Sequence, residues 1–176
     1  MNQAIRIGER ALRRWVRERT RAPRGGSRRD REREDSHHQA DRGAYPGDFT
    51  GTPTIEYAPV KDDEADPGEV VWTWVPFEED FSQGKDRPVL VIGHDGPWLL
   101  CLQVSTVGDP GEREWETSQG RYWVDIGTGG WDNQGRPSEA RVNRIIRIAP
   151  EAVRRIGARL DPQTYRDVAR QVLRHY

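Results

Sequence analysis

Residues 84–104 read "GKDRPVLVIGHDGPWLLCLQV" and contain two apolar runs, 88–92 and 98–104, with a short polar segment between them. Apolar runs of this length, bounded by Gly and Pro, are typical of buried strands. We expect the segment "HDGPW" to form a five-residue hairpin loop, which is a common loop length. The stretch therefore predicts two central antiparallel strands.

Arg87 stands directly before Pro88, at the start of the first apolar run. A residue that precedes proline is held in extended geometry, so we expect Arg87 to lie at the mouth of a strand. A guanidinium held there offers a planar fork of donors to an oxyanion, above all to a phosphate. The alternative is a surface arginine paired with the neighbouring Asp86.

The expected hairpin sets the pairing of its strands. If Gly93 faces Leu99, then Arg87 faces Ser105, and a guanidinium and a hydroxyl meet at one mouth of the fold. A slip of one residue would place a neighbour of Ser105 there instead. His94 would lie about 20 Å away at the other end of the hairpin, so it is expected to be a turn residue.

Three more segments have the composition of strands, and turn-rich segments separate them. They are residues 69–75, 121–126 and 141–148, the last of which also fits a helix. Short strands at turn-separated intervals favour a small antiparallel barrel or sandwich over a βαβ sheet.

The C-terminal segment predicts helix. Asp161 is a good N-cap and Pro162 a good first helical residue. The apolar residues that follow are spaced so that one helical face packs on the barrel, and these are Tyr165, Val168, Ala169, Val172 and Leu173. A shorter helical turn is expected from Pro150. The chain is therefore expected to be mainly β with C-terminal helices.

The N-terminal part has a different character. Residues 1–21 predict a basic amphipathic helix that contacts an anionic membrane surface, nucleic acid or a partner, and the alternative is a marginal helix in a loose tail. Residues 22–66 offer little to bury, so they predict a disordered linker. The remaining residues, 67–176, form the expected domain, and residues 1–66 are expected to be dispensable for it.

Composition narrows the class of protein further. The single cysteine, Cys101, and the scattered histidines exclude a disulfide framework and predict no metal site and no cofactor. No stretch is long and apolar enough to span a bilayer or to act as a signal peptide, which predicts a soluble cytoplasmic protein. Residues 1–43 carry 13 Arg against 7 acidic residues, although the formal net charge of the chain is only -1.

Several motifs together resemble the MazF/PemK family of toxin ribonucleases from type II toxin–antitoxin systems. These are "PGEVVWTWVPFEED", the loop that ends in "RPVLVIG", the strand that ends in "VST" and the tail "RIAPEAVRRIGARLDPQTYRDVARQVLR". The resemblance implies an SH3-like antiparallel β-barrel of the MazF/PemK/CcdB type, a homodimer and a cognate antitoxin. It also implies metal-independent cleavage of single-stranded RNA, in which the ribose 2′-hydroxyl attacks the adjacent phosphate.

The resemblance also implies roles for individual residues. Arg87 corresponds to the family's catalytic arginine and Ser105 to the hydroxyl residue that ends the next strand, with Thr106 beside it. Donors arranged in advance around a phosphoryl group stabilise its transition state by about 3 to 4 kcal/mol each. Gln83 and Lys85 are expected to contact the RNA backbone, together with Thr106.

One loop has a charge that opposes this interpretation. Glu78, Glu79 and Asp80 place three acids near the expected site, and such charge repels a phosphate backbone. The alternative function is therefore a non-catalytic barrel that binds nucleic acid or protein and is tethered by residues 1–21.

Overall fold

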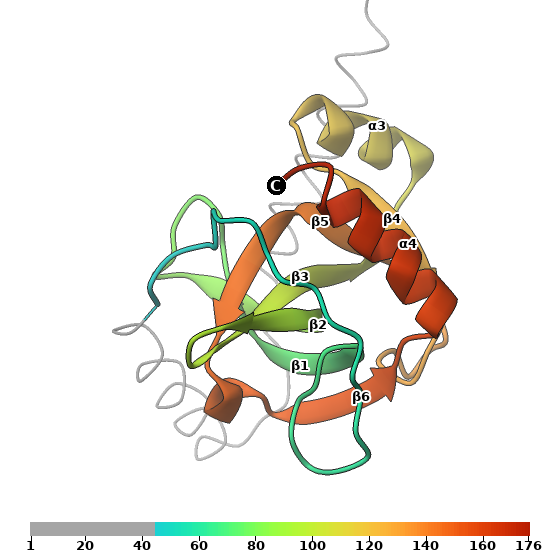
Figure 1. Cartoon of the computed structure of the whole chain (residues 1–176). Helices are drawn as coiled ribbons and strands as arrows, with labels where there is room; N and C mark the ends of the chain where they lie inside the picture. The colour runs from blue at the N-terminus through green and yellow to red at the C-terminus, as the bar shows by residue number, and fades with distance from the viewer. Residues whose placement is uncertain (1–44) are drawn as a thin grey trace, which may run out of the picture. The chain divides into compact units, whose positions relative to one another are not determined.

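The computed structural model of the chain describes residues 45–176 (Figure 1). The predicted N-terminal helix, residues 1–21, and the first part of the predicted linker lie outside these residues. The segment Gly108–Arg121 belongs to a separate compact unit and is described by itself. It contains α3 (Pro110–Ser118), whose N-cap Asp109 accepts a hydrogen bond from the Gly111 amide.

The rest of the described chain is built around one antiparallel sheet of six strands, in the order β4-β5-β3-β2-β1-β6. The strands are β1 (Glu69–Pro76), β2 (Gly84–Asp95), β3 (Trp98–Thr106), β4 (Trp123–Gly127), β5 (Ser138–Ile148) and β6 (Arg155–Arg159). The prediction of a mainly β, antiparallel fold with a C-terminal helix is confirmed. The segment 141–148, which also fitted a helix, is strand.

Both faces of the central strands are buried, which explains their unbroken apolar runs. Val89 and Val91 of β2 face one core, and Leu90 and Ile92 face the other. The second core is larger because α4 (Pro162–Val172), which lies over this side of the sheet (Figure 1), adds Tyr165 and other apolar side chains to it. Strands buried on both sides need no polar alternation.

The loop that follows β4 joins the two ends of the curved sheet. The Trp72 indole N–H donates to the backbone oxygen of Trp131 at 3.0 Å, and Trp131 itself is only 2% exposed. Gly157 of β6 lies against Trp131, where an added Cβ would stand 3.1 Å from its Cα. Side-chain packing therefore connects the loop to β1 and β6.

The β2–β3 hairpin differs from the prediction. The pairing runs to Asp95 and Trp98, so the loop contains two residues rather than five. Gly96 has a φ of 58°, which suits the first central position of a tight turn. Gly93 pairs with Leu100 rather than Leu99, but an irregularity between Val91 and Gly93 returns the strands to the predicted register from Val91 to Val89. The predicted loop was wrong, because the two strands extend further than their apolar runs.

The segment after β5 was predicted only in part. Its helical turn is present as a 3-10 helix at Pro150–Ala152, but the strand β6 that follows was not predicted. Strand β6 is an edge strand that pairs only with β1, and edge strands often carry exposed charged residues. The two exposed arginines and the glycine of "RIGAR" therefore do not show the apolar pattern of a strand. The helix α4 begins as predicted, with the Asp161 carboxylate accepting from two backbone amides.

Residues 45–66 do not have the character of the predicted disordered linker. Phe49 forms a bridge with Ile145 of β5, and the Glu56 amide donates to the Ile92 oxygen at 3.0 Å. The Tyr57 hydroxyl donates to the Leu160 oxygen at 2.8 Å. These groups contact partners that are far away in the sequence, so local composition did not reveal their order.

Candidate functional site

Arg87 lies near one end of β2, half-buried, and pairs with the fully buried Thr73 of β1. It shares a face with Val89, because alternate residues of a strand point to the same side. Asp86 therefore points to the other side, where its carboxylate forms an ion pair with Arg154.

Ser105 lies near the end of β3 and pairs with Glu139 of β5, which in turn pairs with Asp125 of β4. Directly opposed residues share a face, with Cβ atoms about 5 Å apart. Glu139 is only 9% exposed, whereas Ser105 is half-buried. The sheet therefore places a hydroxyl next to a largely buried carboxyl group.

The register relates Arg87 to Ser105. The β2–β3 pairing reaches Val89 and Gln103, and its continuation by two residues brings Arg87 level with Ser105. Beyond that point β2 remains paired with β1, and β3 remains paired with β5. We call the set across these strands the mouth row, which consists of Thr73, Arg87, Ser105, Glu139 and Asp125. A direct contact between Arg87 and Ser105 stays a prediction.

The other predicted site residues have different surroundings. Thr106 pairs with Ser138 on the opposite face of the sheet from Ser105. Lys85 is exposed on the Arg87 side of β2. The Gln83 side-chain amide donates to the Asp80 carboxylate at 2.8 Å, inside the β1–β2 loop. Their contact with RNA stays a prediction.

The acidic β1–β2 loop uses at least two of its carboxylates within the protein. The Asp80 carboxylate accepts hydrogen bonds from the backbone amide and hydroxyl of Ser82 at 2.9 and 2.6 Å. Glu78 accepts two hydrogen bonds from the Arg141 guanidinium, at 2.8 and 3.0 Å. One carboxylate of the acidic loop is therefore paired with the guanidinium of Arg141 on β5.

Arg141 was not predicted as a site residue. It pairs with Trp123 across β4 and β5, on the face that carries Glu139, and is 5% exposed. Its Nε also donates to the Asn143 side chain at 3.3 Å. No local pattern marks Arg141 in the sequence, because Glu78 is 63 residues away. Glu139, in the mouth row, was missed for a similar reason.

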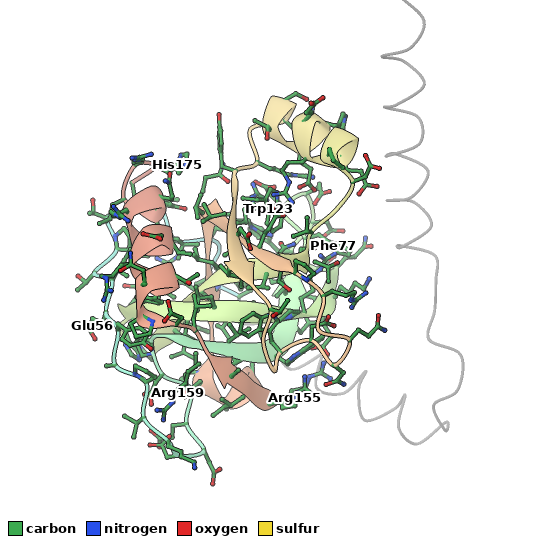
Figure 2. The ribbon with its side chains drawn as sticks, turned by 90° about the vertical axis from the view of Figure 1, so that its right-hand side faces the viewer. Glu56, Phe77, Trp123, Arg155, Arg159 and His175 are labelled. Atoms are coloured by element: carbon green, nitrogen blue, oxygen red, sulfur yellow. The ribbon has the colours of Figure 1, made fainter. Side chains whose placement is uncertain are left out.

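Three aromatic residues of the sheet and its loops differ in burial. Trp131 is in the core, whereas Tyr122 is 44% exposed and its ring lies 4.9 Å from that of His175. Figure 2 shows His175 and Glu56 on the α4 side of the sheet, while Trp123 lies away from the helix. The face with Arg141 therefore also carries a half-buried indole.

Two further findings concern residues 45–176. Within this range, no three His, Cys, Asp or Glu side chains are grouped so that they could hold a metal ion. None of the helices described there is both long enough and apolar enough to cross a membrane. The prediction that His94 is a turn residue was wrong: it is an exposed residue of β2, paired with Leu99 of β3 just before the turn.

Comparison with known proteins agrees with the fold. Residues 66–176 match the model of a family described as PemK-like, MazF-like toxins of type II toxin–antitoxin systems. No curated protein matches the chain. The match covers more than half of the chain, and it includes all six strands, the mouth row and α4. The chain therefore belongs to the PemK-like, MazF-like family of toxins of type II toxin–antitoxin systems.

Proposed function

We propose that this protein is a metal-independent endoribonuclease that cleaves single-stranded RNA. The mouth row supports the proposal, because it aligns a guanidinium, a hydroxyl and a carboxyl group across neighbouring strands of a toxin-family fold. A phosphoryl-transfer reaction needs donors for the developing negative charge and a base for the attacking hydroxyl.

In the proposed reaction the ribose 2′-hydroxyl oxygen attacks phosphorus and the bond from phosphorus to the 5′-oxygen breaks. The 2′-hydroxyl proton passes to the Glu139 carboxylate, and the departing 5′-oxygen takes a proton from water. Arg87 and Ser105 donate hydrogen bonds to the phosphoryl oxygens. The products are a 2′,3′-cyclic phosphate and a 5′-hydroxyl.

The proposal also covers the RNA contacts beside the cleaved bond, the oligomeric state and the partner protein. Lys85, Gln83 and Thr106 contact the flanking RNA backbone, with Gln83 leaving Asp80 to do so. The protein acts in the cytoplasm as a homodimer and is neutralised by a cognate antitoxin. The type II toxin family supports the antitoxin, because its members are one half of a toxin–antitoxin system.

The test is incubation of the full-length protein with single-stranded RNA in EDTA, beside Arg87→Ala. We expect a loss of about 10²- to 10³-fold in the cleavage rate for this variant, because one transition-state donor is removed. Arg154→Ala is the matched control: it removes a half-exposed arginine that is paired with the neighbour of Arg87, and it should retain activity.

Two results would overturn the proposal: cleavage that requires a divalent metal, or equal activity of wild type and Arg87→Ala. Tight binding of RNA with no cleavage by the wild type would instead support the non-catalytic binding module tethered by residues 1–21.

A further inference from the structure

We propose that Glu78 competes within the molecule with RNA phosphate for the guanidinium of Arg141, so that substrate must displace the β1–β2 loop. The inference rests on the proposed function, because the competitor of Glu78 is an RNA phosphate. It assigns a regulatory contact to the loop whose acidity opposes nucleic-acid binding.

The two partners differ in burial. The Arg141 side chain is 6% exposed and belongs to β5, an inner strand between β4 and β3. The Glu78 side chain is 42% exposed and belongs to a surface loop. The cation is therefore held within the sheet, while the anion lies on a surface loop.

The geometry of the pair is also that of phosphate recognition. Glu78 accepts from both terminal nitrogens of Arg141, at 2.8 and 3.0 Å. Such two-point pairing is the arrangement that a guanidinium makes with either a carboxylate or a phosphate. Glu78 thus occupies the donors that a phosphate oxygen pair would use.

The loop does not depend on this ion pair for its shape. The Phe77 amide donates to the Gln83 oxygen at 2.8 Å, and the Gln83 amide donates to the Asp80 oxygen at 3.0 Å. These bonds and the side chain of Asp80 close the turn from within. The turn can therefore keep its shape when Glu78 leaves Arg141, while its Phe81 ring also contacts the Tyr45 ring, with 5.0 Å between the centroids.

Departure of Glu78 alone would be unfavourable, because it leaves a buried cation unpaired by a carboxylate. An incoming phosphate removes this cost by replacing the anion. Arg141 also shares its face with Glu139 of the mouth row, so the replacement takes place on the side where the backbone of the RNA is proposed to lie.

The experiment measures binding of a fluorescent 2′-O-methyl RNA oligonucleotide of random sequence, which cannot be cleaved through a 2′-hydroxyl. The full-length wild type is compared with Glu78→Gln and with Glu79→Gln. Both variants remove one negative charge from the same loop, so a general electrostatic effect would change them equally. Folding of each variant is checked by thermal unfolding.

We expect Glu78→Gln to bind about fivefold more tightly than wild type, the factor that loss of an ordinary exposed ion pair implies. The logarithm of its association constant should also fall more steeply with the logarithm of the salt concentration, with a slope more negative by about 0.7. The reason is that in wild type the phosphate only replaces the Glu78 carboxylate at Arg141, whereas in the variant it neutralises a free positive charge. Glu78→Asp keeps the charge on a shorter side chain and should lie between the two.

Equal affinity of wild type and Glu78→Gln, or an equal gain in both Gln variants, would overturn this inference and leave the proposed function intact. Failure of wild type and every variant to bind the oligonucleotide would overturn both. If Glu78→Gln fails to fold, Glu78→Asp decides the question. An affinity of Glu78→Asp equal to that of wild type would then overturn the inference.

Discussion

Two arginines of β5, three positions apart, form nearly the same interaction in different surroundings. Arg144 is 4% exposed and donates to both carboxylate oxygens of Asp48, at 2.8 and 3.2 Å. Arg141 is 5% exposed and donates to both carboxylate oxygens of Glu78. The two guanidinium groups are alike, so any difference in role comes from their carboxylate partners.

The Asp48 side chain is less exposed than that of Glu78, 22% against 42%. Its carboxylate also accepts from the Tyr45 hydroxyl, and Arg144 donates further to the Pro76 oxygen at 3.0 Å. Burial opposes the charge of Arg144, but the hydrogen bond and charge of Asp48 still raise its pKa. Burial, and then the hydrogen bond to Asp48, raise the pKa of the Tyr45 hydroxyl. We call the contacts of Asp48 with Arg144 and Tyr45 the clamp, and we infer that the clamp stabilises the fold.

The Glu78 side is half-exposed, and its loop is closed by its own hydrogen bonds. We infer from the contrast that an arginine–carboxylate pair holds a segment more firmly when its carboxylate is less exposed and has a further partner, as Asp48 has in Tyr45. The more exposed pair is the one that we propose to exchange with a ligand.

The largest expected effect comes from removing the clamped segment. A chain shortened to begin at Asp66 loses Asp48, Phe49 and Ile55 together, which leaves Arg144 unpaired and uncovers part of the larger core. We expect it to lose cooperative unfolding in urea, while a chain that begins at Tyr45 keeps it. Cooperative unfolding of both chains would show that the clamp adds little and that residues 1–66 are dispensable.

Asp48→Ala tests the same clamp with one substitution. It leaves a buried guanidinium without its carboxylate, which should lower the free energy of unfolding by about 3 to 5 kcal/mol. Glu78→Gln should lower it by less, about 1 kcal/mol, because the carboxylate is half-exposed and the amide oxygen that replaces it can still accept a hydrogen bond from Arg141. Urea unfolding of both variants gives the two values, and equal losses would remove the distinction between the pairs.

Glu139→Gln extends the comparison to the mouth row. We expect the rate of RNA cleavage to fall by about 10²-fold, because the amide cannot accept the 2′-hydroxyl proton. Asp125→Asn, on the exposed edge strand of the same row, is the control and should retain most activity. If both variants cleave alike, the base lies elsewhere.

The smallest effect is expected at a third pair, between Arg136 and Asp132 in the loop after β4. Hydrogen bonds from the Arg136 side chain lower the pKa of Asp132 to about 2. A lowered carboxyl pKa contributes stability above the ordinary value of 3.8, and this is lost as pH falls through about 2. The thermal midpoint of Asp132→Asn should therefore lie slightly below wild type at pH 6 and meet it near pH 2. A difference that persists at the lower pH would contradict this origin.

Much of the fold could be predicted from local patterns. The runs 88–92 and 98–104 predict buried strands, and the pair Asp161 and Pro162 predicts the start of α4, because these signals depend on neighbouring residues. The register of β2 and β3 near Val89 was also predicted, although the loop was not.

The candidate site was predictable only in part. By itself, the sequence determined five of the six strands, the start of α4 and the position of Arg87 directly before the Pro88 strand, since backbone geometry and apolar patterning act over a few residues. Only the tertiary structure decided that Glu139 lies beside Ser105, that Asp48 pairs with Arg144 and that Glu78 pairs with Arg141. Burial and charge pairing depend on distant segments that meet when the sheet curves, and no local pattern encodes them.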